Sequence, residues 1–184
     1  MTLDEKKLMT WAKRQHDIAA ANGWHGAMAS NAHMLALIVT EVAEIIEADR
    51  KERRYDASVF EKYKAQMGDD YGFVCFYDAE VKHTIDEEFA DVCLRLLDLA
   101  WDCHHEEMRW FDDNISIPTY CRTTTEKAWY LIDKELGWGV FQIARCIAFM
   151  YLWAEQEHID LYFHIENKLR YNALMSKEKK IKRY

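Results

Sequence analysis

Proline and glycine are scarce in this chain of 184 residues, which holds one proline, Pro118, and six glycines. These two residues interrupt helices and mark turns, so their scarcity leaves long stretches of the chain uninterrupted. Apolar residues recur at intervals of three and four through most of these stretches, which is the spacing of amphipathic helices. We therefore expect an all-α fold, and the length fits a single domain over residues 1–184.

The sequence also lacks closely spaced cysteine pairs and long apolar runs. The five cysteines form an odd set without a Cys-x-x-Cys pair, so neither a disulfide framework nor a zinc knuckle is indicated, and a reducing compartment fits best. The N-terminus lacks the apolar core of a signal peptide, and the most apolar window, "WGVFQIARCIAFMYLW", is short and carries Gln142 and Arg145. We expect a cytoplasmic protein that does not bind membranes.

Positive charge is in deficit, because the formal net charge at pH 7 is -8. A general nucleic-acid binder needs an excess of Lys and Arg to displace counterions from phosphates, so we expect no nucleic-acid partner. Hydrophobic residues make up 50% of the chain and aromatic residues 14%, a composition far from that of disordered proteins. The chain is expected to fold around a core.

Cap residues and apolar spacing predict six main helices. The first runs over about 3–22 from a Thr2/Glu5 capping box, and the second over about 30–52 after Ser30 or Asn31. A third opens at the Thr84-x-x-Glu87 capping box, and the others cover 123–136, 139–157 and 160–175. The connection over 53–83 is polar and mixed, with a short helix near 57–66 and a weak strand-like run, "YGFVCFY". Residues 176–184 form a basic tail that we expect to be solvated.

Carboxylates interrupt the apolar faces of two predicted helices. In the second helix apolar residues alternate at intervals of four and three over 34–48, and Glu41 occupies one of these inward positions. Glu44 lies three residues further on and borders the same face. Glu88 and Asp91 repeat this spacing at the start of the third helix. Two acidic pairs are therefore expected on two core helices.

These acids have two interpretations. Most glutamates on helices are the solvated edge of an amphipathic surface. Four carboxylates within ~4 Å of one another, however, repel by ~1 kcal/mol per pair in water and by ~4 kcal/mol at an effective dielectric constant of 20. Packing them together needs a cation, and oxygen ligands are preferred by Mg²⁺ or Mn²⁺. Because Mg²⁺ usually takes few carboxylates together with substrate phosphates, the second interpretation indicates phosphate chemistry.

Three segments carry a resemblance to a known family. "LIVTEVAEIIEADRK", "DEEFADVCLRLLDLA" and "IDLYFHIENKLRYN", in this order, resemble the MazG-like, all-alpha NTP pyrophosphatase superfamily, which includes dimeric dUTPases and dCTPases. The resemblance covers about residues 20–51, 84–100 and 158–173. It implies a helical bundle of that type and a homodimer or higher homo-oligomer, which hydrolyses nucleoside triphosphates with Mg²⁺ to monophosphate and pyrophosphate.

The resemblance assigns the metal-binding role to the four acids Glu41, Glu44, Glu88 and Asp91. Glu41 or Glu44 would also orient or deprotonate the attacking water. Glu47 lies one turn beyond Glu44, where a second metal site and an ordinary surface position are both open. Glu87, next to the third acid, is better explained as the cap of its helix.

The nucleotide-binding positions of the family match Lys168, Tyr171 and Asn172 in "NKLRYN", which share one helix face. The resemblance implies that Lys168 touches phosphate and that Asn172 touches the sugar or base, while a core position is the alternative for Tyr171. The turn Gly23-Trp24-His25 matches an aromatic turn of the family. Trp24 would stack on a base or pack between helices, and base and sugar preference are not readable from these residues.

Two regions depart from the family pattern. Relatives pass almost directly from "LLDLA" to "IDL", whereas this chain inserts about residues 101–157, enough for two helices. This aromatic insertion would fill the core, form a dimer face or wall the base pocket. The basic tail over 176–184 lacks the Arg-Pro and His-Gly of many relatives, so phosphate contacts from the tail are not implied.

Two other function classes fit parts of the sequence. Asp102-x-x-His105 and Glu155-x-x-His158, set beside the glutamates of the second helix, suggest a di-iron carboxylate bundle. The aromatic insertion suggests a noncatalytic helical interaction module. Bound iron would support the first alternative, and an unchanged activity of Glu44→Gln the second.

Overall fold

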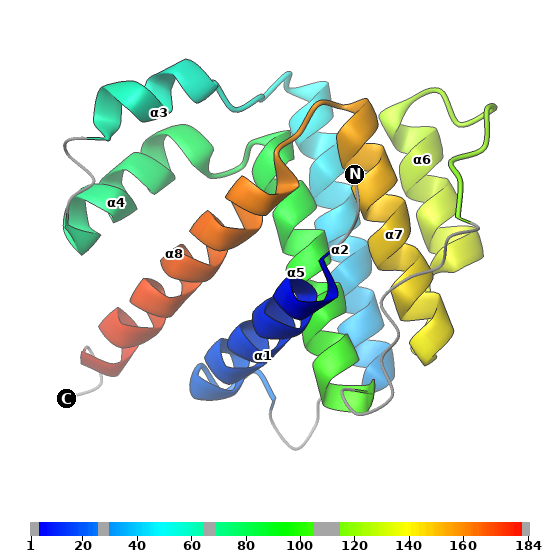
Figure 1. Ribbon diagram of the computed structural model, residues 1–184, viewed down its shortest axis with the longest axis horizontal. Helices are drawn as coiled ribbons and strands as arrows, with labels where there is room; N and C mark the ends of the chain where they lie inside the picture. The colour runs from blue at the N-terminus through cyan, green and yellow to red at the C-terminus, as the bar shows by residue number, and fades with distance from the viewer. Residues whose placement is uncertain (1–3, 26–29, 65–68, 105–114, 182–184) are drawn as a thin grey trace.

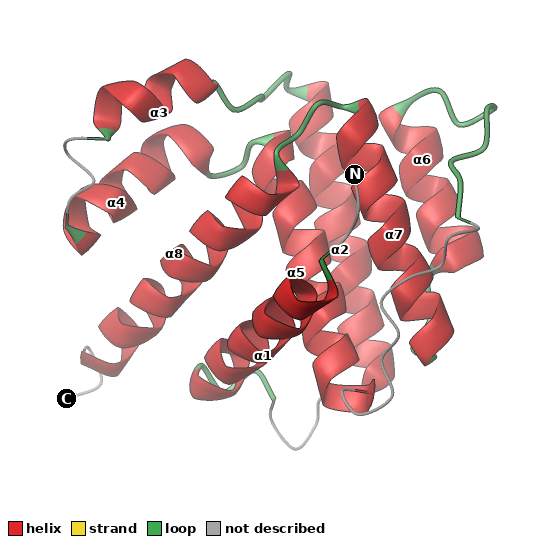
Figure 2. Ribbon diagram, viewed as in Figure 1, coloured by secondary structure: helices red, strands yellow, loops and turns green. Residues whose placement is uncertain are grey.

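The computed structural model describes residues 4–25, 30–64, 69–104 and 115–181, and all regular elements in these ranges are helices (Figures 1 and 2). The expected all-α fold is therefore confirmed for the described part of the chain. The elements are α1 (Glu5–Ala21), α2 (Asn31–Arg50), α3 (Ala57–Tyr63), α4 (Asp70–Phe76), the π-helical η2 (Tyr77–Val81), α5 (Ile85–His104), α6 (Thr124–Tyr130), the π-helical η3 (Leu131–Glu135), α7 (Val140–Gln156) and α8 (Leu161–Ile181).

Helix α5 forms the centre of the molecule and contacts α1, α2, α7 and α8 (Figure 1). Its sequence is apolar nearly all round, which is typical of a helix covered on every side. Phe89 of α5 packs against Trp153 of α7 with ring centroids 4.7 Å apart, and both side chains are fully buried. Burying a side chain of this size stabilises a fold by roughly 1.5–3 kcal/mol, so α5 supplies much of the core.

Most predicted helix ends are confirmed. Ser30 caps α2 by accepting a hydrogen bond from the His33 N–H, and Thr123 begins α6 with a complete capping box. The first helix differs from the prediction, because its cap is Asp4, whose side chain accepts from two backbone N–H groups of the first turn. The predicted cap Thr2 lies outside the described residues. Asp4 stands next to the first helical residue, where an N-cap carboxylate also interacts favourably with the helix dipole.

The connection between α2 and α5 is more helical than expected. The predicted short helix near 57–66 is confirmed as α3, but the strand-like interpretation of "YGFVCFY" is wrong, because this run forms α4 and enters η2. Phe73, Phe76 and Tyr77 follow one another at intervals of three and one, and all three are buried in a small aromatic cluster with Tyr171. A short apolar run has no clear period, so packing decides its structure.

The aromatic insertion and the last helix complete the fold. The two inserted helices are present: α7 packs on α5 and α6 packs on α2. The insertion therefore fills the core, which was one of the three roles expected for it. Helix α8 runs to Ile181, beyond the predicted end at residue 175, so the first part of the basic tail is helical. No helix among the described residues combines the length and the apolar character needed to cross a bilayer.

Candidate metal centre

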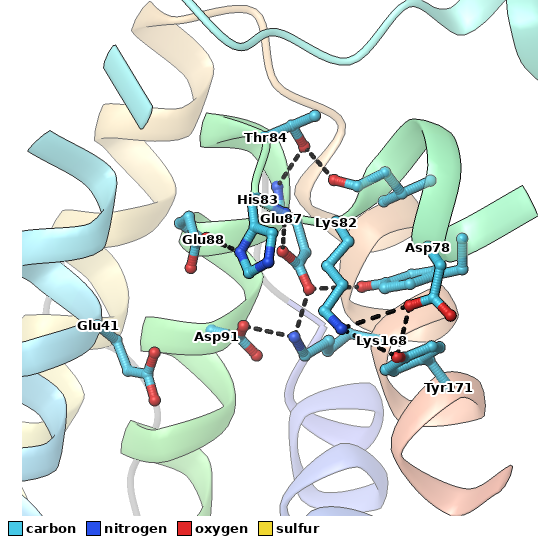
Figure 3. Close-up of polar contacts among 12 residues, drawn as sticks. Glu41, Asp78, Lys82, His83, Thr84, Glu87, Glu88, Asp91, Lys168 and Tyr171 are labelled. Carbon is cyan, nitrogen blue, oxygen red and sulfur yellow. Dashed lines mark hydrogen bonds and ion pairs between the residues drawn. The ribbon is translucent and has the colours of Figure 1, made fainter. Parts of the chain in front are cut away.

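Carboxylates from α2 and α5 meet where the two helices pack together. Oxygen atoms of Glu41, Glu88 and Asp91 lie within 4.8 Å of one another, and Figure 3 shows Glu41 on α2 facing α5. A second group of possible ligands, Glu44, His83 and Glu88, meets the same distance limit. Glu88 belongs to both groups. The structure thus brings the four predicted acids together in two groups of possible ligands, and Glu88 is the carboxylate that the two groups share.

Glu88 is the most enclosed of these acids. Its side chain is 3% exposed, Oε1 lies 3.6 Å from His83 Nδ1, and Oε2 is buried without a hydrogen-bond partner. Burial, followed by the negative charges of Glu87, Asp91 and Glu44, raises the pKa of Glu88 to about 9. A buried oxygen without a partner costs free energy. The position therefore suits a carboxylate that binds a cation.

Asp91 forms an ion pair with a lysine from α8. Lys168 Nζ lies 2.5 Å from Asp91 Oδ2 and also forms an ion pair with Glu87 Oε1 (Figure 3). Burial alone would lower the pKa of Lys168, but the carboxylates of Asp91 and Glu87 raise it well above its usual value. Burial raises the pKa of Asp91 to about 7, although Lys168 opposes this shift. Lys168 is therefore held as a cation inside the acidic centre.

Glu87 does more than the predicted capping. Its Oε2 accepts a hydrogen bond of 2.7 Å from the His83 N–H, and its own N–H donates to Thr84 Oγ1 at 3.2 Å, which together hold the start of α5. Its Oε1 accepts from Tyr77 Oη at 3.2 Å and from Lys168 Nζ. The capping pattern was readable from the sequence, but the contact with Lys168 was not, because it joins α5 to a helix about eighty residues away.

A pocket of about 220 Å³ opens beside Glu41 and Asp91. Three of the predicted nucleotide-binding residues line it together with these acids. They are Trp24, Lys168 and Asn172. The other lining residues are Gln15, Leu94 and Arg95. Two of the four acids that the resemblance assigned to metal therefore line one cavity with three of the four residues that it assigned to nucleotide.

Arg95 is a member of this pocket that sequence reasoning missed. Its Nε donates to Glu41 Oε1 at 2.9 Å, and its guanidinium lies 5.4 Å from the centroid of the Trp24 ring. The residue lies four positions after Asp91, so helical spacing places it on the same face of α5. That spacing is the signal that would have found it.

Tyr171 is the predicted nucleotide residue that does not line this pocket. Its ring stacks on Tyr77 with centroids 4.4 Å apart, and its Oη donates to Asp78 Oδ1 at 2.7 Å. Lys82 Nζ donates to the same hydroxyl at 3.3 Å. The side chain thus lies in the aromatic cluster under α4, which agrees with the core position left open for it.

A second pocket, of about 390 Å³, is lined by Glu44, Glu47, Ala48, Lys51, Arg53, His83 and Glu88. Glu47 is exposed and pairs with Lys51 Nζ at 2.5 Å, and it is in neither group of possible ligands. His83 was not predicted from the sequence. Its φ of 64° lies in the left-handed region, and the bond from its N–H to Glu87 helps to hold it there.

The histidine motifs of the di-iron alternative lie elsewhere. Glu155 and His158 are both exposed at the end of α7, so they do not point into the bundle. His105 lies outside the described residues, and Asp102 is exposed near the end of α5.

Comparisons with protein-family models, curated proteins and solved structures gave no match. The functional assignment therefore depends on the site itself and on the resemblance of the three sequence segments.

Proposed function

We propose that this protein is a Mg²⁺- or Mn²⁺-dependent nucleoside triphosphate pyrophosphohydrolase, which converts a nucleoside triphosphate to the monophosphate and pyrophosphate. The observation that supports it best is the convergence of Glu41, Glu88 and Asp91 beside a pocket that also holds Lys168. The proposal includes the MazG-like fold type, action on noncanonical or surplus nucleotides in the cytoplasm, and assembly into a homodimer or higher homo-oligomer.

The acidic centre fits a hard divalent cation. Its first ligand group consists of carboxylate oxygens alone, which Mg²⁺ and Mn²⁺ prefer. The buried Oε2 of Glu88 lacks a protein partner, and a cation would satisfy it. Glu41, Glu88 and Asp91 would hold one ion, and Glu44 would join through the second group. When bound, the ion would neutralise charge on the phosphoryl oxygens and lower the pKa of a coordinated water.

The side chains around the ion have separable tasks. Lys168 would bind a phosphate oxygen, because its charge is maintained by Asp91 and Glu87. Glu41 would orient the attacking water and accept its proton, and its hydrogen bond from Arg95 fixes the position of its carboxylate. Lys51 and Arg53 in the second pocket would attract the departing pyrophosphate.

The base and sugar would occupy the end of the pocket near Trp24. This side chain is 38% exposed and lines the pocket, so part of the indole is accessible to a ligand. Stacking of a base on an aromatic ring is worth about 1–3 kcal/mol. Asn172 lines the same pocket and offers both a donor and an acceptor to sugar or base.

The test is a panel of NTPs and dNTPs with Mg²⁺ and with Mn²⁺, in which monophosphate and pyrophosphate are measured together. We expect equal amounts of both products from the preferred substrate. Glu88→Gln and Asp91→Asn should each lower kcat roughly 100-fold or more, as loss of transition-state charge stabilisation does elsewhere. Glu61→Gln is the control, because Glu61 is exposed on α3, pairs with Lys64 and lines neither of the two pockets. Release of orthophosphate alone, or no turnover across the panel, would reject the proposal.

A noncatalytic interaction module is the second candidate, and one observation favours it. Tyr120, Trp129, Trp138 and Phe141 in the insertion are each more than half exposed. Tyr120 and Trp129 also line a largely apolar pocket of about 410 Å³. An exposed apolar patch of this kind often marks a protein contact. This candidate predicts no turnover and no effect of Glu44→Gln.

A further inference from the structure

Two histidines and two aspartates meet at a second place on α5. His16 lies on α1, His25 lies in the turn after α1, and Asp98 and Asp102 lie one turn apart on α5. One ring nitrogen of each histidine and one oxygen of Asp102 lie within 4.8 Å of one another. The two imidazole rings are tilted, with centroids 4.5 Å apart. Three segments of the chain therefore bring possible metal ligands to one point.

This cluster is separate from the acidic centre. Asp98 and Asp102 follow Asp91 by seven and eleven residues on α5, which corresponds to about 10 and 16 Å along the helix axis. None of its possible ligands belongs to the groups around Glu88. The sequence pattern had paired Asp102 with His105, but the fold places it beside His16 and His25.

Asp98 lies behind the two imidazoles. Its side chain is 1% exposed, and its Oδ1 lies 2.9 Å from His25 Nε2 and 3.4 Å from His16 Nδ1. Histidines that bind metals usually donate their other N–H to a carboxylate, which fixes the tautomer and the orientation of the ring. An imidazole that donates one N–H to Asp98 keeps a lone pair on its other nitrogen. Asp98 makes this hydrogen bond with His25 and lies within ion-pair distance of His16.

The histidines are not fully satisfied by Asp98 alone. His16 Nδ1 is buried and has no hydrogen-bond partner, although it lies within ion-pair distance of Asp98. A network built only to neutralise Asp98 would be expected to give each ring a well-formed bond. Asp102, an exposed carboxylate, also lies close to the same two rings, and neutralising Asp98 does not require it.

We propose that His16, His25 and Asp102 bind a divalent transition-metal ion, with Zn²⁺ as the first candidate, and that Asp98 orients the two imidazoles. Two imidazoles and one carboxylate are a donor set that zinc accepts, with a fourth position left for water. The imidazoles disfavour Mg²⁺, which prefers oxygen. Donor atoms around tetrahedral zinc lie roughly 3.4 Å apart, so the three groups need to close by at most about 1.4 Å from the observed limit.

The site would tie the turn that carries His25 to α1 and α5. Trp24 is the neighbouring residue in that turn and lines the pocket beside Glu41. A bound ion would therefore hold one wall of that pocket in place. The metal proposal itself stands on the histidine cluster and does not depend on the proposed hydrolase activity.

The first test is calorimetric titration of the full-length protein with Zn²⁺ in saturating Mg²⁺, which keeps the acidic centre filled. We expect one equivalent of Zn²⁺ to bind. Asp102→Ala should weaken binding at least about tenfold, and because Asp102 is exposed, this change should leave the fold intact. His33→Ala is the matched control, since His33 is an exposed histidine on α2 outside the cluster. Repeating the titration in His83→Asn excludes binding through His83.

The second test needs no variant. In ¹⁵N spectra of the histidine side chains, Zn²⁺ should shift the ring nitrogens of His16 and His25 and leave those of His33 unchanged. The proposal is overturned if no equivalent of Zn²⁺ binds, if Asp102→Ala binds as tightly as the wild-type protein, or if the signals of His16 and His25 do not move.

Discussion

Lys168 and Asp91 form an ion pair of 2.5 Å that joins α8 to α5 at the edge of the acidic centre. The same ammonium group contacts Glu87, so one lysine neutralises part of the charge of the buried Glu87 and of the partly buried Asp91. This arrangement lets the acids pack together in the protein without an ion. It also means that any divalent ion bound by Asp91 shares that carboxylate with Lys168.

Replacing Lys168 with Met should destabilise the ion-free protein strongly. Removing one partner of a buried ion pair leaves an uncompensated charge and typically costs about 3–5 kcal/mol. Saturating Mg²⁺ should reduce this loss, because the ion supplies the missing positive charge. Urea unfolding in chelator and in Mg²⁺ measures both values. Lys51→Met, which breaks only the exposed pair with Glu47, is the control and should change little. Equal losses for Lys168→Met in the two conditions would contradict this account.

Stability without divalent ions should fall as the pH rises. The pKa of Glu88 is about 9 and that of Asp91 about 7 in the folded protein, both above the usual values of 4.5 and 3.8. The folded state therefore binds more protons than the unfolded state over roughly pH 4 to 9, and the free energy of unfolding decreases through this window. Each group contributes a slope of up to about 1.4 kcal/mol per pH unit.

Glu88→Gln removes one of these titrations and should flatten the decrease. Urea unfolding in chelator at several pH values from 5 to 9 measures the slope for both proteins. Mg²⁺ should bind more tightly as the pH rises, because it requires the deprotonated carboxylates. A slope that is the same in Glu88→Gln and in the wild-type protein would show that this residue does not carry the raised pKa.

Tyr171 and Asn172 are neighbours in the sequence, and we expect different effects of replacing them. Tyr171→Phe should leave KM unchanged, since the ring lies under α4 and not in the pocket, and should cost about 0.5–1.5 kcal/mol of stability through the lost hydrogen bond to Asp78. Asn172→Ala should raise KM with little loss of stability. Kinetics and thermal unfolding of both variants provide the measurement. A raised KM in Tyr171→Phe would instead place its hydroxyl at the substrate.

His83→Asn should change metal preference without unfolding the protein. Asn tolerates the left-handed backbone conformation that His83 adopts, so the turn before α5 should persist. Loss of the imidazole should weaken Mn²⁺ binding by about tenfold and affect Mg²⁺ less, because Mg²⁺ favours oxygen ligands. Titration of Mn²⁺ followed by electron paramagnetic resonance measures the first value. Unchanged Mn²⁺ affinity would exclude His83 as a ligand.

The sequence predicted those features that arise from local periodicity. Helices α2, α5 and α7 were recognisable from caps and apolar spacing, and the inward position of Glu41 followed from the same pattern. The segment "YGFVCFY" was misread because a short apolar run fits a strand and a buried helix equally well, and only its packing against Tyr171 selects the helix.

Features that depend on distant contacts were beyond the sequence. The pairing of Lys168 with Glu87, the approach of Arg95 to Trp24 and the joining of His16 with His25 each bring together separate helices or turns. No spacing rule within one helix encodes them. The lack of a hydrogen-bond partner at the buried Glu88 Oε2 is likewise a result of tertiary packing.

Among the described elements, helix α5 is both the most enclosed and the one that carries Glu88, Asp91, Arg95 and Asp98. A saturation mutagenesis screen for abundance and a separate screen for activity should therefore return largely overlapping positions along this helix. Directed evolution would find it difficult to alter the chemistry here without first gaining stability elsewhere. Variation is more easily accommodated on the exposed face of α6, which lies at the edge of the molecule away from α8 (Figure 1).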